Sequence, residues 1–487
     1  MSSTAASIAV PADDAEASRS AAGHDARTRR LLEGPVLATL LRLAAPNLGE
    51  AAARVAFISC DALFVSWLGT DALAGVALVF PLLLMTQMIS AGGLGSGVAA
   101  AVARALGAGE REQAAKLAGQ GLLLGLLAAA AIAIGMLAFG PQLYRLMGAQ
   151  GAALGYAAQY SALVFGAGAL VWVMNITANI LRGTGVMTVP ASAIVLGEAA
   201  HLTVSPALIL GWGPLPQMGV AGAALGVLAT YGVGSAVLLA YLLSGRALVR
   251  LRLADLRPAR APLLAILGIG TVSALNVLQF QAAVLLLTGY VGVYGAQALA
   301  GFGAALRLEQ LQIPIVFAFG SAIIAMIATN QGAGRHERVT RIAWCGTGIA
   351  VAIGAVFAAV ALSLPGHWLR LFSAEPAVIA AGRDYLRTVG AAYPLMAGAL
   401  GLFFVCLGLG RIGAPFAAGL LRLAIIGLGG AALLALWQPP AWGLYLVVTD
   451  AYVVYGLAML WAARRNLHRT VSQGAVSQGA VSQGASS

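Results

Sequence analysis

The sequence Ala105-Leu106-Gly107-Ala108-Gly109 ends one apolar stretch, and Gly332-Ala333-Gly334 ends another. The second Gly-Ala-Gly lies 225 residues after the first. Further pairs at this offset are Arg145 with Arg370, Tyr160 with Tyr385, Pro190 with Pro415 and, after a one-residue slip, Gly69 with Gly295. A constant offset over such a length indicates an internal duplication. The chain therefore consists of two homologous halves.

The apolar stretches between these landmarks predict membrane spans. Apolar residues make up 60% of the chain and charged residues only 9%, and about 20 apolar residues suffice for one span. The candidate helix cores are residues 37–66, 75–102, 117–139, 155–180, 188–211, 219–243, 261–289, 296–329, 341–364, 384–407, 412–436 and 442–462. We expect an all-α membrane protein with twelve transmembrane helices in two homologous six-helix lobes around a central cavity.

The predicted organisation has two lobes and three connecting or terminal segments. These are a disordered cytoplasmic tail at 1–33, a first lobe at 34–245, a basic cytoplasmic linker at 246–260, a second lobe at 261–465 and a low-complexity cytoplasmic tail at 466–487. Because each half has an even number of helices, both enter the membrane from the same side, as parallel repeats. Two such lobes can rock about a shared cavity, so transport is the expected function.

The net charge of +11 does not indicate nucleic-acid binding, because the cations alternate between connections. Most of the 28 Lys and Arg residues, Arg182 among them, fall in the tails or the predicted inner loops, whereas the outer loops keep Arg145 and Arg370. This asymmetry follows the positive-inside rule. It predicts a multi-pass protein of the inner (plasma) membrane with both termini cytoplasmic. The three cysteines show no paired spacing, so neither a disulfide nor a metal site is expected.

Asp61 is the first candidate site residue, because it lies inside a predicted span. An ionisable group at membrane depth is costly and marks a functional site by default. Its repeat counterpart is Leu286 or Leu287, so the duplication does not explain it. The alternative is a structural carboxylate neutralised by Arg54, two turns earlier on the same helix.

Glu198, His201 and Ser205 form the second candidate site, because they share one face of the fifth predicted helix. A carboxylate beside an imidazole can exchange a proton near physiological pH. The alternative is a buried ion pair that only fixes helix packing. The second-lobe counterparts of Glu198 and His201 are Leu423 and Ile426, so we expect the ionisable groups to be concentrated in the first lobe.

Other polar residues in the spans are candidates for the substrate cavity. They are Asn175, Asn179, Asn276, Gln279, Glu309 and Tyr393. Glu50 and Arg54 are spaced i, i+4 and are expected to pair with each other for structural reasons.

With these residues in view, the chain resembles the multidrug and toxic compound extrusion (MATE) family over residues 34–465. The matching segments are Cys60-Asp61-Ala62-Leu63-Phe64-Val65-Ser66-Trp67-Leu68-Gly69, Ala105-Leu106-Gly107-Ala108-Gly109, Leu181-Arg182-Gly183-Thr184-Gly185, Gly219-Val220-Ala221-Gly222-Ala223-Ala224 and Gln331-Gly332-Ala333-Gly334-Arg335. The resemblance implies that Asp61 is the ion-coupling carboxylate of the first lobe, and that the protein is not an enzyme.

The fifth helix departs from the family pattern, which often has Asn-x-x-x-Asp-Pro where this chain has His201-Leu202-Thr203-Val204-Ser205-Pro206. The resemblance therefore leaves the coupling ion open between a proton and sodium. Helix seven offers Asn276, Gln279 and Gln281 in place of the acids that some relatives use. Together with the imidazole of His201, this favours a proton, with no cofactor.

The expected substrate is an amphipathic organic cation, because an apolar cavity with one ionisable carboxylate is complementary to it. We expect a monomer in the lipid bilayer that binds no nucleic acid. Two alternatives share the fold: a sodium-coupled drug antiporter, and a flippase for lipid-linked sugars or polysaccharides. A flippase should show a basic cavity, and the mid-span arginines are Arg54, Arg307 and Arg422.

Overall fold

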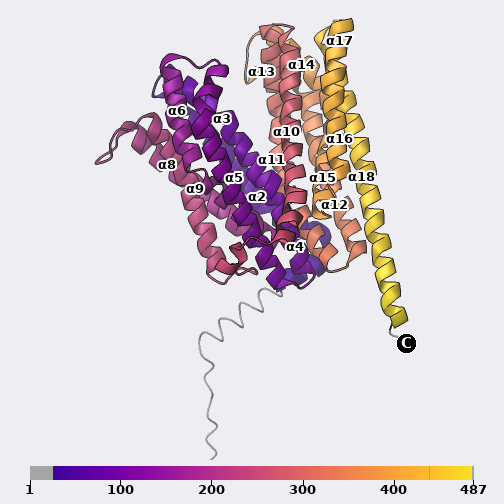
Figure 1. Cartoon of the computed structure of the whole chain (residues 1–487). Coiled ribbons are helices and arrows are strands. Elements are labelled where there is room, and N and C mark those ends of the chain that lie inside the picture. The colour runs from indigo at the N-terminus through magenta and orange to yellow at the C-terminus, as the bar shows by residue number, and fades with distance from the viewer. Residues whose placement is uncertain (1–25, 438, 485–487) are drawn as a thin grey trace, which may run out of the picture.

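The computed structural model describes residues 26–437 and 439–484, without the side chains of residues 55–59, 61, 62 and 473–484. Nearly all of the described chain is helical, and the helices run side by side in two groups (Figure 1). The first group comes from the first half of the sequence and the second group from the second half.

The first lobe contains α2 to α9. Their bounds are α2 Val36–Ser66, α3 Thr70–Met88, α4 Ser96–Gly107, α5 Arg111–Leu146, α6 Gly151–Gly166, α7 Ala169–Gly183, α8 Thr188–Leu210 and α9 Val220–Leu243. A π-helical segment, η1 (Ile89–Gly95), joins α3 to α4 in one continuous span, and α6 and α7 form a span bent by 45°.

The second lobe contains α10 to α18. Their bounds are α10 Arg260–Gly292, α11 Ala296–Gly332, α12 His336–Ser363, α13 Pro365–Arg370, α14 Pro376–Val389, α15 Tyr393–Gly408, α16 Gly413–Ala424, α17 Gly430–Leu436 and α18 Ala441–Gly484. The 3-10 turn η3 (Gly390–Ala392) joins α14 to α15, and the π-helical turn η4 (Ile425–Gly429) joins α16 to α17. A further 3-10 turn, η2 (Leu253–Leu256), lies in the linker between the lobes.

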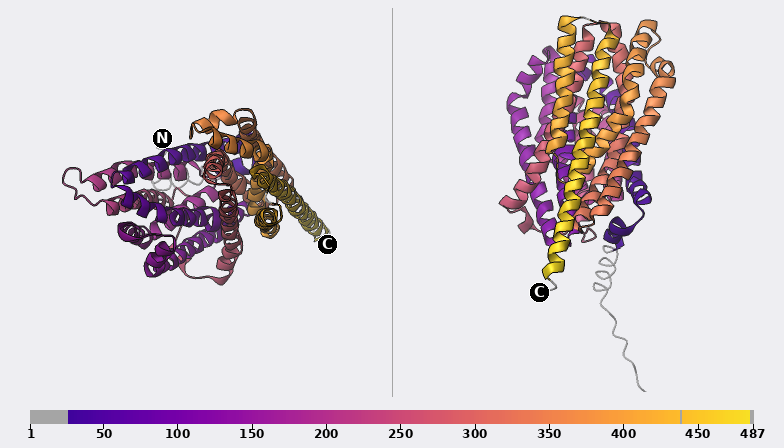
Figure 2. Two further views of the ribbon diagram at one scale, coloured as in Figure 1. Left: turned by 90° about the horizontal axis from the view of Figure 1, so that it is seen from above. Right: turned by 90° about the vertical axis from the view of Figure 1, so that its right-hand side faces the viewer.

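The predicted all-α membrane fold in two lobes is confirmed. Within the described residues, ten helices are long and apolar enough to cross a membrane, and the bent pair α6 and α7 makes an eleventh span. The remaining predicted helix, residues 37–66, corresponds to α2, a helix of 31 residues that carries Glu50, Arg54 and Asp61. Each lobe has its own hydrophobic core, and the two helix groups are also distinct when viewed from above (Figure 2).

Glycines at equivalent positions of the two halves set the same turns. Gly69 and Gly295, with φ of 94° and 96°, precede α3 and α11. Gly109 and Gly334, with φ of 81° and 69°, follow α4 and α11. Because L-residues with side chains rarely adopt positive φ, the glycine pairs aligned in the sequence mark the duplicated helix boundaries.

The two lobes meet at one end of the molecule, which we call the basic end because Arg104, Arg111, Arg257 and Arg335 lie there. Gly107 of α4 packs against the Thr329 carbonyl of α11, and Gly332 packs against the Arg104 carbonyl. A Cβ atom on either glycine would lie 2.0 Å from the carbonyl oxygen that it faces. The pairs are equivalent under the 225-residue offset, so this contact has the symmetry of the repeat.

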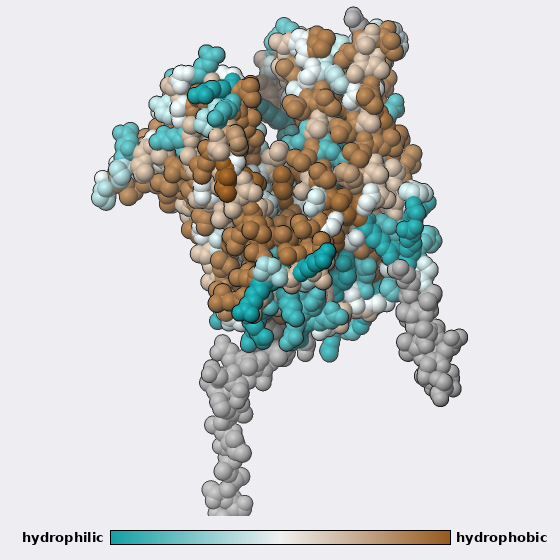
Figure 3. Space-filling view, viewed as in Figure 1, coloured by the Kyte–Doolittle hydropathy of each residue, from teal (hydrophilic) through white to brown (hydrophobic). Residues whose placement is uncertain are grey.

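The opposite end of the molecule is open between the lobes. Figure 3 shows a hollow there, between the parts formed by the first and the second lobe, and a broad hydrophobic belt below it. Hydrophilic surface gathers at the basic end. The structure is therefore closed at the basic end and open at the other.

Two predicted boundaries differ from the structure. Residues 26–33, expected in a disordered tail, are helical, and Leu31 is buried. The last helix was expected to end near 462, with a tail from 466, but α18 continues to Gly484. Asn466 is buried because it packs against Arg411, whose guanidinium donates to the Asn466 carbonyl at 2.9 Å.

Candidate functional site

The three predicted residues of α8 are all buried inside the first lobe. Glu198 is 5% exposed, and His201 and Ser205 are fully covered. The His201 ring stacks on Phe64 of α2, with centroids 6.3 Å apart and planes inclined by 20°. Ser205 lies against Gly226 of α9, where a Cβ atom would come within 2.5 Å of the serine Cβ. The structure thus brings the three residues together between α2, α8 and α9.

Asp61 lies in α2, one helical turn before Phe64, and α2 packs against α8. Its side chain is outside the part of the chain that the structure describes. The backbone therefore places the Asp61 position on the helix that contacts His201, and the role predicted for its carboxylate stays a prediction.

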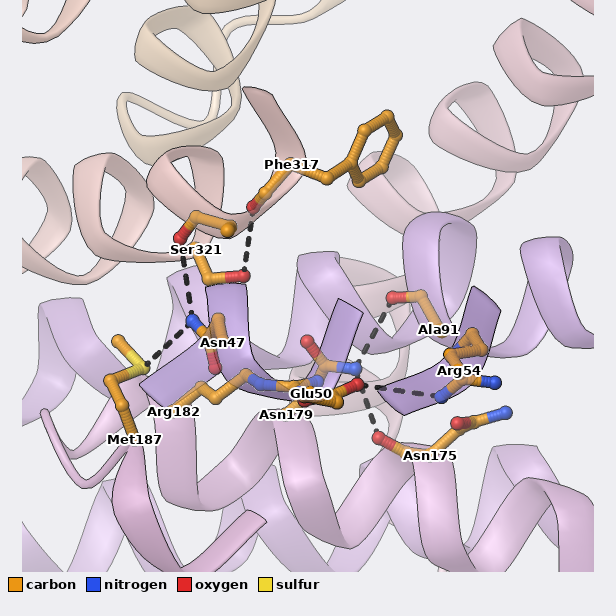
Figure 4. A network of polar contacts seen from close by, with 11 residues as sticks. Asn47, Glu50, Arg54, Ala91, Asn175, Asn179, Arg182, Met187, Phe317 and Ser321 are labelled. Atoms are coloured by element: carbon orange, nitrogen blue, oxygen red, sulfur yellow. Dashed lines mark hydrogen bonds and ion pairs between the residues drawn. The ribbon is translucent and has the colours of Figure 1, made fainter. Parts of the chain in front are cut away.

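Glu50 of α2 accepts from two arginines (Figure 4). Arg54 donates to Oε1 at 3.4 Å, and Arg182 of α7 donates to Oε2 at 2.7 Å. The predicted Glu50–Arg54 pair is confirmed. The assignment of Arg182 to an inner loop needs correction, because it lies in the last turn of α7 and forms the shorter ion pair. Arg54 also interacts electrostatically with Glu198, which links this network to α8.

Asn175 and Asn179 of α7 hold the π-helical segment η1. The Asn175 amide donates to the Ser90 hydroxyl at 2.8 Å, and the Asn179 amide donates to the Ala91 carbonyl at 3.2 Å. Both asparagines are buried. Figure 4 shows them beside α2, next to the Glu50 network. Their amides therefore hold the π-helical segment of the second span in place.

Glu309 of α11 is the centre of a buried polar cluster in the second lobe. It is 3% exposed and accepts from Tyr385 of α14 at 2.7 Å and from Tyr452 of α18 at 2.5 Å. Each tyrosine hydroxyl donates to a different carboxylate oxygen. Tyr393, another predicted residue, is buried nearby and interacts electrostatically with Glu309.

Arg422 of α16 supplies a cation beside this cluster. It is 3% exposed, and its guanidinium lies 4.8 Å from the ring centroid of Phe280 and 4.9 Å from that of Tyr455. Arg422 and Tyr452 also line a small cavity of about 10 Å³. The expectation that ionisable groups concentrate in the first lobe therefore needs correction, because the second lobe has its own buried carboxylate and guanidinium.

Asn276 and Gln279 contact each other in α10. The Gln279 amide donates to the Asn276 side-chain carbonyl. Gln279 is buried against Gly419 of α16, whereas Asn276 is half-buried. The structure therefore separates the predicted polar residues into a group inside the first lobe and a group inside the second.

Comparisons with known proteins agree with this architecture. A model of the MatE family matches residues 55–206 and 273–433. The FAD transporter of Shewanella oneidensis is 30% identical over 309 residues, covering 63% of this chain and 68% of the relative. The probable multidrug resistance protein NorM of Deinococcus radiodurans is 29% identical and covers 89% of this chain and 96% of the relative.

Solved structures show the same fold. A MATE crystal structure in the bent conformation superposes with a TM-score of 0.84 at 25% identity, covering 92% of this chain and 99% of the other. An outward-facing multidrug resistance MATE transporter superposes with a TM-score of 0.82 at 26% identity, covering 91% and 98%. The chain belongs to the MatE family, and it is a multi-pass membrane transporter rather than an enzyme.

Proposed function

We propose that the protein exports amphipathic organic cations in exchange for protons by alternating access. The buried carboxylate and imidazole of Glu198 and His201 carry this proposal. They lie on one helix face inside the first lobe and contact the helix that bears Asp61. Such a pair can take up a proton on one side of the membrane and release it on the other.

The orientation that we propose places the basic end in the cytoplasm. The excess of Lys and Arg at that end supports this assignment through the positive-inside rule. The hollow at the opposite end then faces outward, and the chain sits in the inner (plasma) membrane with both termini inside. In this state a proton from outside would neutralise the coupling carboxylate and release the cation outward.

Transport in proteoliposomes tests the coupling ion. Purified protein should move a fluorescent amphipathic cation when a pH gradient is imposed in sodium-free buffer. A proton ionophore should abolish the movement, because it collapses the gradient without touching the protein. Transport that follows only a sodium gradient at constant pH would instead favour the sodium-coupled alternative.

The variant Asp61→Asn tests the role of the acid in α2. It keeps the size of the side chain and removes its charge, so the protein should fold in detergent but lose gradient-driven efflux. Loss of a coupling group should lower the initial rate by about a hundredfold or more. Normal resistance in cells that express Asp61→Asn would refute the assignment. The matched control is Asp450→Asn, which removes an exposed acid from α18.

Transport of a flavin dinucleotide is the second candidate. It rests on the similarity to a protein named as an FAD transporter and on the buried Arg422 between two aromatic rings. A guanidinium suits a phosphate group, and aromatic rings suit a planar ring system. Uptake of labelled FAD into the same proteoliposomes, compared with uptake of the cation, distinguishes the two substrate classes.

A further inference from the structure

A groove of about 730 Å³ opens at the basic end, outside the cavity between the lobes. The start of α5 forms one wall, and the linker between the lobes forms the other. The groove lies where α9 ends and where α5 and α10 begin, so three helices long and apolar enough to cross a membrane end at its level. It shares no residue with the site described above.

The floor of this groove is a specific contact between the linker and α5. Gln120 is 1% exposed, and its amide donates to the carbonyls of Asp255 at 2.7 Å and Arg257 at 2.8 Å. Its side-chain oxygen accepts from the Ala259 backbone N–H at 3.1 Å. Gly119 lets the linker approach, because a Cβ there would lie 2.5 Å from the Asp255 carbonyl. The linker is therefore fixed to the first lobe.

The fixed linker gathers positive charge around the groove. Five cationic residues line it, against two carboxylates. The cations are Arg111, Lys116, Arg250, Arg252 and Arg257. One of the carboxylates, Asp255, already accepts from the Arg252 backbone N–H at 2.8 Å. The groove therefore presents an excess of donors that suit an anion.

The apolar surroundings favour a lipid as the source of that anion. Leu253, at the start of the turn η2, is 87% exposed, and Leu243 at the end of α9 is 67% exposed. Exposed leucines beside arginines are typical of a surface at the boundary between headgroups and acyl chains. Basic pockets between transmembrane helices on the cytoplasmic side bind anionic headgroups.

We propose that this groove binds the phosphate headgroup of an anionic phospholipid of the inner leaflet. Lys116 on α5 and Arg257 on the linker contact the phosphate from opposite walls, while the acyl chains run along the exposed leucines. The bound lipid joins the linker to α5. The proposal uses the orientation proposed above, but it concerns a site remote from the coupling residues.

Binding can be measured on the full-length protein in a neutral detergent. Short-chain phosphatidylglycerol should raise the midpoint of thermal unfolding, because a ligand that binds only the folded state stabilises it. Short-chain phosphatidylcholine and inorganic phosphate at the same concentration should have little effect. Each cation removed weakens binding about fivefold, so Lys116→Gln/Arg257→Gln should bind phosphatidylglycerol about 30-fold more weakly.

The control variant is Arg464→Gln/Arg465→Gln, which removes two exposed cations from α18 of the second lobe. A second groove variant, Arg250→Gln/Arg252→Gln, keeps the test valid if the first one folds poorly. Groove variants that bind phosphatidylglycerol as tightly as the control would overturn the site. An equal response to phosphatidylcholine would overturn the headgroup, and an equal response to inorganic phosphate would overturn the lipid. A transport defect with unchanged lipid binding would bear only on the proposed function.

Discussion

Glu198 and His201 are the two buried ionisable residues of α8, and they lie less than one helical turn apart. We predict that the two residues act as one unit in coupling efflux to the proton gradient, because charged groups at this spacing interact. Glu198→Gln and His201→Ala should each shift the pH at half-maximal efflux by about one unit. The double variant should lose less transport free energy than the sum of the single losses.

The control for this pair comes from the internal repeat. Leu423→Ala and Ile426→Ala change the equivalent positions of the second lobe, so they should alter stability or substrate range without moving the pH dependence. Strictly additive effects of the Glu198 and His201 variants in a pH-titrated efflux assay would show that the two residues act separately.

Glu309 and its two tyrosines predict a different kind of effect. The carboxylate accepts from Tyr385 and Tyr452 at separate oxygens, so Glu309→Gln places an amide donor against one of the hydroxyls. Glu309→Gln and Tyr452→Phe should each destabilise the protein by about 1–3 kcal/mol. Because the residues share one hydrogen bond, the double variant should lose less than the sum.

Thermal unfolding in detergent measures these losses. Tyr445→Phe is the matched control, because within the described residues the Tyr445 hydroxyl is buried without a hydrogen-bond partner. Its midpoint should stay near that of the wild type. A drop as large as that of Tyr452→Phe would mean that the loss of any buried hydroxyl destabilises this region, and that the bond to Glu309 contributes nothing particular.

The neighbours of a site residue were predictable from the sequence when they lay on the same helix. The spacing of Glu50 and Arg54, or of Glu198 and His201, is fixed by helix geometry. The bonds from Tyr385 and Tyr452 to Glu309 join helices that are 76 and 143 residues away in the chain. The repeat singled out Tyr385 through its match with Tyr160, but no pattern in the sequence gives the direction in which a side chain meets another helix.

At the scale of the elements, small residues let helices from different lobes touch. Gly107 and Gly332 each meet a carbonyl of the opposite lobe, and the sequence revealed this pair as a repeat landmark. Their function as contacts emerged only from the structure, because alignment of two halves does not show that the halves meet. The start of α11 was predicted at residue 296, as the structure has it, whereas the predicted core at 75–102 fell short of the start of α3 and the end of α4. In the structure, glycines with positive φ mark these boundaries.

The variant Gly332→Ala should weaken closure of the basic end. Its Cβ would lie 2.0 Å from the Arg104 carbonyl, and forcing extra atoms into a packed contact costs about 1–3 kcal/mol. Efflux should therefore fall by about tenfold, while the protein still folds. Gly348→Ala in α12 is the control, because its added Cβ would meet no described atom within 4 Å apart from its chain neighbours and the backbone of its own helix. Equal efflux by both variants would mean that transport does not require this close approach.

At the scale of the whole molecule, residues 31–34 form an N-terminal strap that bridges the lobes at the basic end. The Leu31 side chain packs on Gly185 of the first lobe. The Leu31 carbonyl accepts from Asn330 of the second lobe at 3.0 Å, and Arg338 donates to the Gly34 carbonyl. The strap is therefore held by both lobes only while the basic end is closed.

Removing the second-lobe side of this strap should shift the conformational equilibrium of the transporter. Asn330→Ala/Arg338→Ala deletes bonds that exist only in the closed state, and hydrogen bonds from charged groups contribute about 1.5–3 kcal/mol each. The population open at the basic end should therefore rise about tenfold or more.

Spin labels at Glu112 and Arg341, exposed positions of the two lobes, measure the change as a longer distance after the three native cysteines are replaced. Arg464→Ala removes a basic-end arginine that stacks on Trp344 and should leave the distances unchanged. If the strap variant also keeps the wild-type distances, the lobe contact at Gly107 and Gly332 closes this end without the strap.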